Sequence, residues 1–248
     1  MSQASPSSKG PAAFVWTLHG AALPSLTRTL PLARAARAGV MRTLDRFGQT
    51  RLPDWLHHAG EEGDSAYWLP LDPNDDGSVE QIACVRPGGL GFEILPGFSA
   101  GADLYLGEGT RGEPAGRWRM EPDSMGPLAP GGLIGPARHW ISATPFVAGR
   151  ETKRENGAPR ARRSLEEQLR DDLQKRGLIA FGVEAAPARE IPGGALTAVK
   201  FDLIAERMRP PPSAPAAFVR LAFAEPVFGP LALGYGAHYG LGFLRPLG

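Results

Sequence analysis

The chain has 248 residues, 42% of them hydrophobic, which suits one large domain or two of roughly 100–120 residues, each with an ordinary buried core. It contains a single cysteine and no apolar stretch near the roughly 18 residues of a membrane span, so we expect no intramolecular disulfide, no membrane partner and a cytoplasmic location. The net charge of +1 neither supports nor excludes a polyanionic partner, because an acidic stretch at 51–125 separates two basic ones.

The first half of the chain alternates strand-like runs with one long helical pattern. Residues 1–11 lack a signal-peptide pattern and are expected to be disordered. A helix is predicted from Leu26 to Phe47, opened by Pro24 and Ser25. Strands are predicted at 12–18, 65–71, 79–85, 91–95 and 118–121. Cys84 lies in the apolar run 82–85 and is therefore interpreted as a buried strand residue rather than a nucleophile.

The residues at 72–77 stack turn-forming side chains between two predicted strands. Their acidic content suggests an EF-hand loop, but the twelve-residue ligand order and the closing glutamate are missing. The five histidines form no metal-ligand spacing either. We therefore expect neither a metal nor another cofactor.

The second half predicts a β-α-β-β-loop-β order. A β-rich run covers 139–147, and Ser164 with Glu167 forms a capping-box pattern for a helix that ends at Arg176, before Gly177. Further strands are predicted at 179–185, 198–206 and 218–224. This order is close to a split βαβ, or ferredoxin-like, unit. The fold class is accordingly α+β with two small sheets.

A basic segment at 150–163 carries six cations and two acids directly after a predicted strand. It suits the binding of phosphates, and a solvated loop without a ligand is the alternative. The residues expected to contact RNA phosphates are Arg150, Lys153, Arg154, Arg160, Arg162 and Arg163.

The region from Gly229 to Phe243 alternates glycines with aromatic and aliphatic residues. It matches neither a Walker loop nor a dinucleotide-binding fingerprint. Since glycine lets a backbone approach a ligand closely, such a loop can present N–H groups to phosphates. A glycine-rich hairpin with no ligand is the alternative. The candidate RNA-binding residues here are Gly234, Gly236, His238, Gly240 and Gly242.

The histidines offer candidate acid–base groups. His57 and His58 lie together between Pro53 and Gly60, on a predicted turn from which an imidazole can reach a ligand. The alternative is that both are solvent-exposed loop residues without a catalytic role. His238, inside the glycine-rich region, could stack on a base or be a packed loop residue. His19 and His139 flank strands and are interpreted as structural.

Two stretches resemble a known family. The run from Trp140 to Lys153 and the one from Phe228 to Phe243 are similar to the type I-U (I-G) CRISPR subunit that fuses the fifth and sixth Cas proteins, and the segment from Tyr67 to Val79 resembles its "Leu-Pro-Leu-Asp" segment. The resemblance spans roughly residues 12–246 and corresponds to the repeat-cleaving half. It implies two ferredoxin-like (RRM-like) domains in tandem, at 12–130 and 131–248, the second carrying the glycine-rich loop.

Members of this repeat-associated (RAMP) superfamily cut CRISPR repeat RNA without metal, with the ribose 2′-OH as nucleophile. The resemblance implies such an endoribonuclease, which stays bound to the 3′ handle of its product and contacts other Cas subunits. The acid–base groups would be His57 or His58 together with Tyr67, and Lys153 would be the cation.

The chain departs from the family pattern at two positions. Ser65-Ala66 stands where a His-Ala pair is expected, and Glu80-Gln81 where Asp-His is expected. Either cleavage uses His57 or His58 instead, or the chain is a non-cleaving RNA-binding subunit of the same kind of complex. A metabolic enzyme that binds a phosphorylated ligand through the glycine-rich loop is a third hypothesis.

Overall fold

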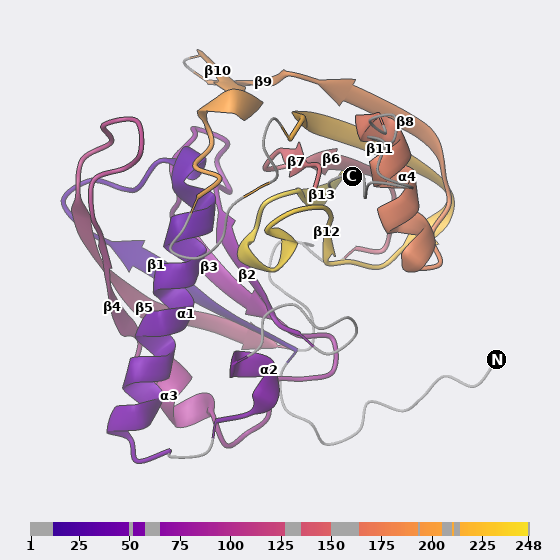
Figure 1. The fold of residues 1–248 in the computed structure, drawn as a ribbon. Coiled ribbons are helices and arrows are strands. Elements are labelled where there is room, and N and C mark those ends of the chain that lie inside the picture. Colours follow the sequence, from indigo (N-terminus) through magenta and orange to yellow (C-terminus); the bar gives the residue numbers. More distant parts are fainter. Residues whose placement is uncertain are drawn as a thin grey trace, which may run out of the picture.

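The computed structural model describes residues 12–49, 52–57, 65–126, 135–149, 164–192, 194–204, 210 and 214–247. Within these residues two antiparallel sheets lie side by side, each with a helix on one face (Figure 1). The fold is therefore α+β, as the sequence predicts. None of the described helices is long and apolar enough to cross a membrane. The expectation of disorder at 1–11 lies outside the described residues.

The first sheet has the strand order β2-β3-β1-β5-β4. Helix α1 packs along it, with small and aliphatic residues such as Ala33, Ala36 and Val40 fully buried. The elements are β1 (Ala13–His19), η1 (Leu26–Arg28), α1 (Thr29–Arg46), α2 (Asp54–His57), β2 (Tyr67–Leu71), β3 (Gln81–Val85), α3 (Leu95–Ser99), β4 (Ala102–Leu106) and β5 (Gly116–Gly126).

The second sheet has the order β12-β13-β6-β11-β7, and β8 also pairs with β11. Helix α4 begins with the predicted capping box: the Ser164 hydroxyl accepts from the Glu167 N–H, and the Glu167 carboxylate accepts from the Ser164 N–H at 2.7 Å. The elements are β6 (Ala137–Ser142), β7 (Phe146–Val147), α4 (Leu165–Lys175), β8 (Ala180–Ala186), β11 (Ala216–Val227), β12 (Leu231–Ala232), η4 (Ala237–Tyr239) and β13 (Phe243–Leu247).

A separate hairpin, β9 (Ala188–Ile191) with β10 (Gly194–Thr197), projects from the second sheet (Figure 1). The one-turn helix η3 (Ala198–Lys200) follows it. The predicted strand at 198–206 is therefore wrong over its described part, because the backbone there bonds to η1 instead: the Asp202 N–H donates to the Thr27 carbonyl at 2.8 Å.

The predicted strand at 91–95 is also wrong. Leu95 begins α3, and Pro96 stands in its first turn, where proline is favourable because it needs no N–H partner there. The pattern of β4, alternately buried and exposed, was a strand signal that the sequence analysis missed. The remaining predicted strands and both predicted helices are confirmed, with ends shifted by a few residues.

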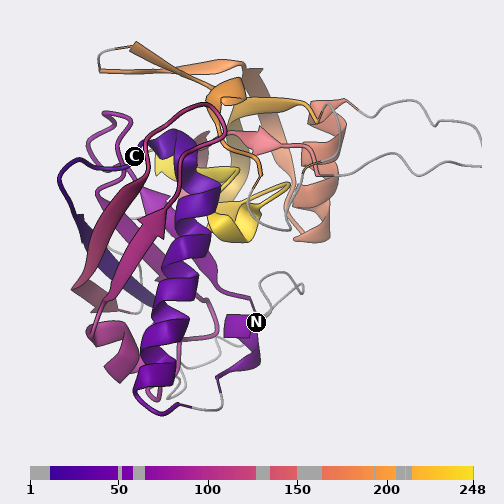
Figure 2. The same ribbon diagram turned by 60° about the vertical axis from the view of Figure 1, so that its left-hand side comes forward.

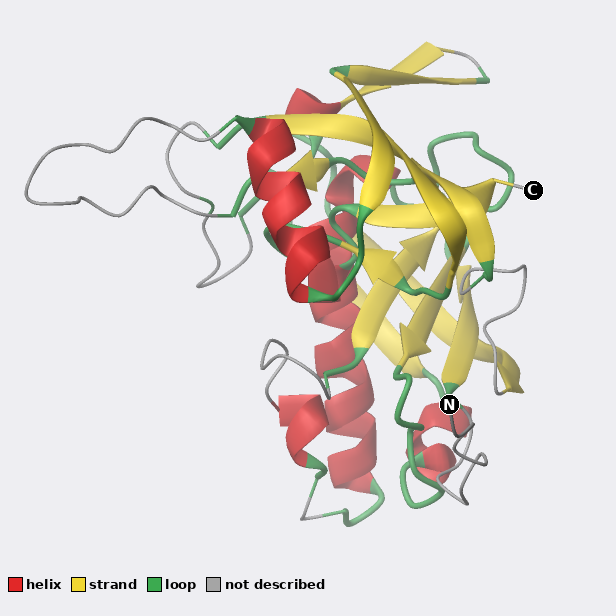
Figure 3. Cartoon of the chain, turned by 90° about the vertical axis from the view of Figure 1, so that its right-hand side faces the viewer, coloured by secondary structure: helices red, strands yellow, loops and turns green. Residues whose placement is uncertain are grey.

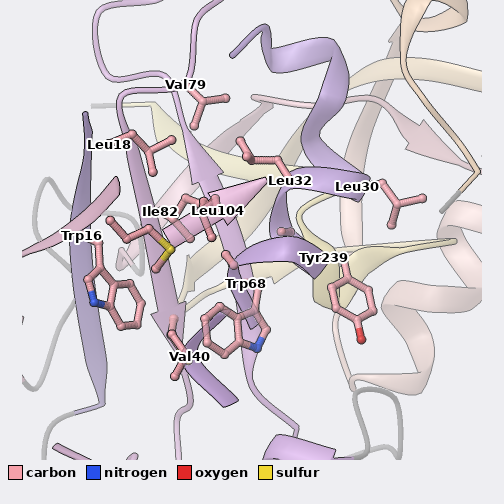
Figure 4. Packing of buried hydrophobic residues seen from close by; sticks show 14 of the residues in the cluster. Trp16, Leu18, Leu30, Leu32, Val40, Trp68, Val79, Ile82, Leu104 and Tyr239 are labelled. Atoms are coloured by element: carbon pink, nitrogen blue, oxygen red, sulfur yellow. The ribbon is translucent and has the colours of Figure 1, made fainter. Parts of the chain in front are cut away.

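The largest core cluster extends from the first sheet into the second half of the chain. Trp16 and Trp68 stack at 5.9 Å between ring centroids, and the Trp16 indole N–H donates to the Phe98 carbonyl at 2.9 Å. Tyr239, from the glycine-rich region, packs into the same cluster beside Trp68 (Figure 4). Cys84 is fully buried in β3, and burial raises the pKa of its thiol, in agreement with a structural role.

Two groups of charged residues tie the halves together. Arg28 and Asp202 form a buried pair, with 3.6 Å between Nε and Oδ2 and side chains only 6% and 3% exposed. The Arg28 guanidinium also donates to the carbonyls of Gly107 and Pro114, and the Thr110 hydroxyl donates to Asp202. In the second group, Asp75 of the 72–77 turn accepts from Arg189 at 2.6 Å and from Arg245.

The buried Arg28–Asp202 pair gives a stability prediction. Asp202→Asn should lower the free energy of unfolding by about 3 kcal/mol, because it leaves the Arg28 charge buried without its counter-charge. Urea unfolding measures the loss. The matched control is Glu225→Gln, which breaks an exposed pair with Arg138 and should cost less than about 1 kcal/mol. Equal costs for the two variants would contradict the prediction.

Candidate functional site

The glycine-rich region lies at the junction of the two sheets (Figure 2). It connects β11 to β13 and contains β12 and η4. Its apolar side chains are buried, with Tyr239 7%, Leu241 0% and Phe243 1% exposed. Full burial of one large apolar side chain contributes about 1.5–3 kcal/mol to the stability of the folded protein. These residues therefore help to hold the two sheets together.

Gly240 allows this region to approach the first sheet closely. Its φ is +81°, and a Cβ at this position would lie 2.8 Å from Cδ of Pro70 and 3.2 Å from the carbonyl oxygen of Trp68. Both the backbone conformation and the contact therefore require a residue without a side chain. The consequence is that η4 lies directly against β2.

The N–H groups of three of the glycines are already used inside the protein. Gly234 donates to the Asp172 carboxylate at 3.1 Å, Gly240 to the Ala237 carbonyl at 3.2 Å, and Gly242 to the Pro145 carbonyl at 2.8 Å. These three N–H groups are therefore engaged within the protein, and the RNA contacts predicted for Gly234, Gly240 and Gly242 stay predictions. Gly236 and His238 stay candidates for RNA contact.

The contact between η4 and β2 brings together two candidate acid–base residues. The rings of Tyr67 and His238 are stacked, with centroids 4.7 Å apart and planes at 25° to each other. Both side chains are half-buried. Tyr67 belongs to the first sheet and His238 to the glycine-rich region, so each half of the chain supplies one ring.

The environment of His238 favours the neutral imidazole. Burial lowers its pKa below the usual 6.5, the charge of Arg176 lowers it further, and a hydrogen bond with the Ala66 backbone acts in the opposite direction. The Nδ1 atom is buried and has no hydrogen-bond partner among the described residues. A neutral imidazole with an unoccupied ring nitrogen is chemically able to accept a proton near pH 7.

One guanidinium group, that of Arg176, acts on the charge state of His238, and that of Arg34 contacts the neighbouring residue Tyr239. Arg34 of α1 lies over the ring of Tyr239, 5.6 Å from its centroid. Arg176, at the end of α4, donates to the Ala232 carbonyl at 2.6 Å. Arg176 thus contributes positive charge near His238, which suits a ligand with phosphate groups.

Most of the other predicted site residues lie outside the described residues: His58, Lys153, Arg150, Arg154, Arg160, Arg162 and Arg163. His57 is the last residue of α2, and its side chain is not described. The residues on either side of the basic segment are described. Before the segment, the Val147 carbonyl accepts from the Tyr235 N–H at 2.9 Å, and after it Ser164 is the N-cap of α4. Strand β7, which precedes the segment, therefore lies beside the glycine-rich region.

One acidic cluster in the described part of the chain has metal-ligand spacing. Oxygens of Asp72, Asp76 and Glu80 lie within 4.8 Å of one another. Burial raises the pKa of Asp72 and of Glu80. The Asp72 oxygens already accept the N–H groups of Gly77 and Asp76, at 2.9 and 3.0 Å, and so stabilise the predicted turn. We assign this cluster to the turn.

The His238 environment predicts a pH dependence of stability. Because the pKa is lower in the folded than in the unfolded protein, the unfolded protein binds more protons as the pH falls through 6.5, and folding is destabilised. Wild type should therefore lose more stability than His238→Gln between pH 7.5 and 5.5, measured as urea midpoints. The control His19→Gln removes an exposed histidine near Glu121. Equal losses in wild type and His238→Gln would refute the prediction.

No protein-family model and no curated protein matches the sequence. Among solved structures, the chain is similar to the CRISPR endoribonuclease Cse3 bound to a 19-nucleotide RNA, at 13% identity over 94% of this chain and 98% of that one, with a TM-score of 0.37. It is also similar to Thermus thermophilus Cse3 bound to an RNA that represents a pre-cleavage complex. The sequence identity is 14%, the match covers 94% of this chain and 97% of that one, and the TM-score is 0.40. A third similar structure is a CRISPR-associated protein Cas6, with 11% sequence identity over 95% of this chain and 98% of that one, and a TM-score of 0.45. TM-scores below 0.5 at such identities establish neither a shared fold nor a shared function.

Proposed function

We propose that this chain is a metal-independent endoribonuclease that binds and cleaves CRISPR repeat RNA and stays bound to the 3′ handle in a type I effector complex with other Cas subunits. The stacked pair of Tyr67 and His238 at the junction of the sheets carries this proposal. The sequence resemblance described above adds to it, because two of the resembling segments, at 67–79 and 228–243, are the ones that supply these rings.

The strand orders support the two-domain part of the proposal. In the first sheet, β2-β3-β1-β5 is the order of a ferredoxin-like unit in which β4 is an additional edge strand. In the second, β8-β11-β6-β13 is the same order, with α4 between the first and second strands. The glycine-rich region takes the place of the second helix there. We propose domains at 12–130 and 131–248 on this basis.

The chemistry that we assign is attack of a ribose 2′-OH on the adjacent phosphorus. The 2′-oxygen forms a bond to phosphorus, the bond to the 5′-oxygen breaks, and the products are a 2′,3′-cyclic phosphate and a 5′-OH. The neutral His238 imidazole accepts the 2′-OH proton, and the Tyr67 hydroxyl donates a proton to the leaving 5′-oxygen. A cation, for which Lys153 is the candidate, stabilises the charged phosphorane.

His57 and His58 stay in the proposal as alternative bases. The departure at Ser65 bears on this choice, since Ser65 is buried next to Ala66, whose backbone faces His238. The position where the family resemblance leads us to expect a histidine therefore adjoins the Tyr67–His238 pair. If that position supplies the base in the family, the base here is His238, His57 or His58.

The same departure favours a second candidate function, a non-cleaving subunit that holds the guide RNA. Incubation with the cognate repeat RNA in EDTA separates the two. The nuclease should give a product that ends in a 2′,3′-cyclic phosphate, since none of its steps uses a metal. Intact RNA with retarded mobility would support the binding subunit, and no shift at all would contradict both.

Single-turnover cleavage by variants tests the assignment of the base. His238→Ala should lower the rate by roughly 100-fold or more with RNA affinity retained, the loss expected for an acid–base residue, and Tyr67→Phe should lower it through the lost proton donor. His19→Ala, at an exposed site, is the control and should cleave at the wild-type rate. If His238→Ala is unimpaired while the double variant His57→Ala/His58→Ala is inactive, the base lies in α2 and the loop after it.

Replacement of Arg150, Lys153 and Arg154 by Ala tests the basic segment. RNA affinity should fall, and the slope of log K against log salt should become shallower by about two to three units, because each phosphate contact contributes close to one unit. Filter binding between 50 and 300 mM salt measures the slope. An unchanged slope would show that these residues do not contact phosphates.

A further inference from the structure

The second sheet has one open face. Helix α4 covers the other face (Figure 3). There Trp140 and Leu221 are buried in one cluster with Leu169 and Leu173 of α4. On the open face, Phe218 of β11 is buried against Phe201 at the junction. The next two residues of β11 on this face are less buried: Arg220 is exposed and Ala222 is half-buried.

A hollow of about 200 Å³ lies on this open face. Gly182 of β8 and Ala222 of β11 are paired across the strands and form its floor. His139, paired with both Ala222 and Leu247, borders it on one side. The hollow exists because its floor has almost no side chain: a Cβ at Gly182 would already lie 3.1 Å from the Ala222 methyl group.

The next cross-strand pair on the same face of the sheet consists of two charged residues. Arg220 of β11 is directly opposite Glu184 of β8, and both are exposed. Side chains at such paired positions stand about 5 Å apart at Cβ. A guanidinium donor and a carboxylate acceptor therefore stand next to each other at the rim of the hollow, with the His139 ring on the neighbouring row.

We propose that this hollow binds one unpaired guanine base of the RNA. The hollow is shallow and open on one side, and its volume of about 200 Å³ suits a single flat heterocycle. Guanine presents two adjacent donors, N1–H and the 2-amino group, to the Glu184 carboxylate, and its O6 accepts from Arg220. The His139 imidazole stacks on the base, as aromatic side chains do with unpaired RNA bases.

This inference rests on the proposed function only in that the ligand is RNA. It also revises the sequence-based interpretation of His139 as structural, because His139 is exposed on β6. The hollow is built from the second sheet alone, whereas the Tyr67–His238 pair needs both halves of the chain. Base recognition and cleavage are therefore separable by substitution.

Fluorescence anisotropy with nine-nucleotide RNAs tests the proposal: oligo-U, oligo-U with one central guanosine, and the same with inosine, which lacks the 2-amino group. Wild type should bind the guanosine RNA about 10-fold more tightly than oligo-U, with inosine in between. Glu184→Gln and Gly182→Val should abolish this preference. Arg138→Met, at an exposed position on the same strand as His139, should lower affinity for all three RNAs alike and keep the preference.

Equal binding of the three RNAs by wild type, or a preference that survives in Glu184→Gln, would overturn the guanine site. Thermal unfolding of each variant shows whether a lost preference reflects a lost fold, and Glu184→Gln, at an exposed position, should melt like wild type. If Glu184→Gln cleaves repeat RNA as wild type does and its base preference is also unchanged, only the guanine site fails. If wild type binds neither repeat RNA nor any of the nine-nucleotide RNAs, the proposed function fails with it.

Discussion

The arrangement of the two sheets depends on the close approach of Gly240 to β2. The backbone at Gly240 has a positive φ and contacts Pro70 and the Trp68 carbonyl at distances that leave no room for a Cβ. Any other residue would meet strain from the backbone conformation and from the contact at once. Because the residues on either side, Tyr239 and Leu241, are buried in the core of the first sheet, this one contact determines where η4 lies.

Charged contacts complement the apolar junction. Hydrophobic burial is non-directional and tolerates sliding between two sheets, whereas ion pairs need particular positions. Asp75 sits in a left-handed conformation, with φ of +61°, at the tip of the 72–77 turn and accepts from Arg189 and Arg245 of the second half. Burial acts to raise the pKa of Asp75, but these hydrogen bonds outweigh it and the pKa is lowered. With the buried Arg28–Asp202 pair, they define one orientation of the sheets.

This orientation has a chemical consequence. Burial at the junction lowers the pKa of His238, and the junction places the His238 imidazole on the Tyr67 ring, so two rings from different halves of the chain lie together. The N–H groups of Gly234, Gly240 and Gly242 bond within the protein and so support this geometry.

The sequence by itself determined the features that have a local cause. The capping box at Ser164, the turn at 72–77 and the burial of Cys84 follow from neighbouring residues, and the structure has all three. The predicted strands at 91–95 and 198–206 failed because a run of apolar residues signals burial but does not specify the partner. For 198–206 the backbone partner is Thr27 of η1, which is far away in the sequence.

Only the tertiary structure decided the composition of the site. Tyr67 and His238 belong to opposite halves of the chain, and their contact requires that Gly240 first bring η4 against β2. The hollow on the second sheet likewise depends on the register that pairs Gly182 with Ala222. Strand register and sheet packing are set by many distant contacts together, and for this reason neither site has a signature in the order of the residues.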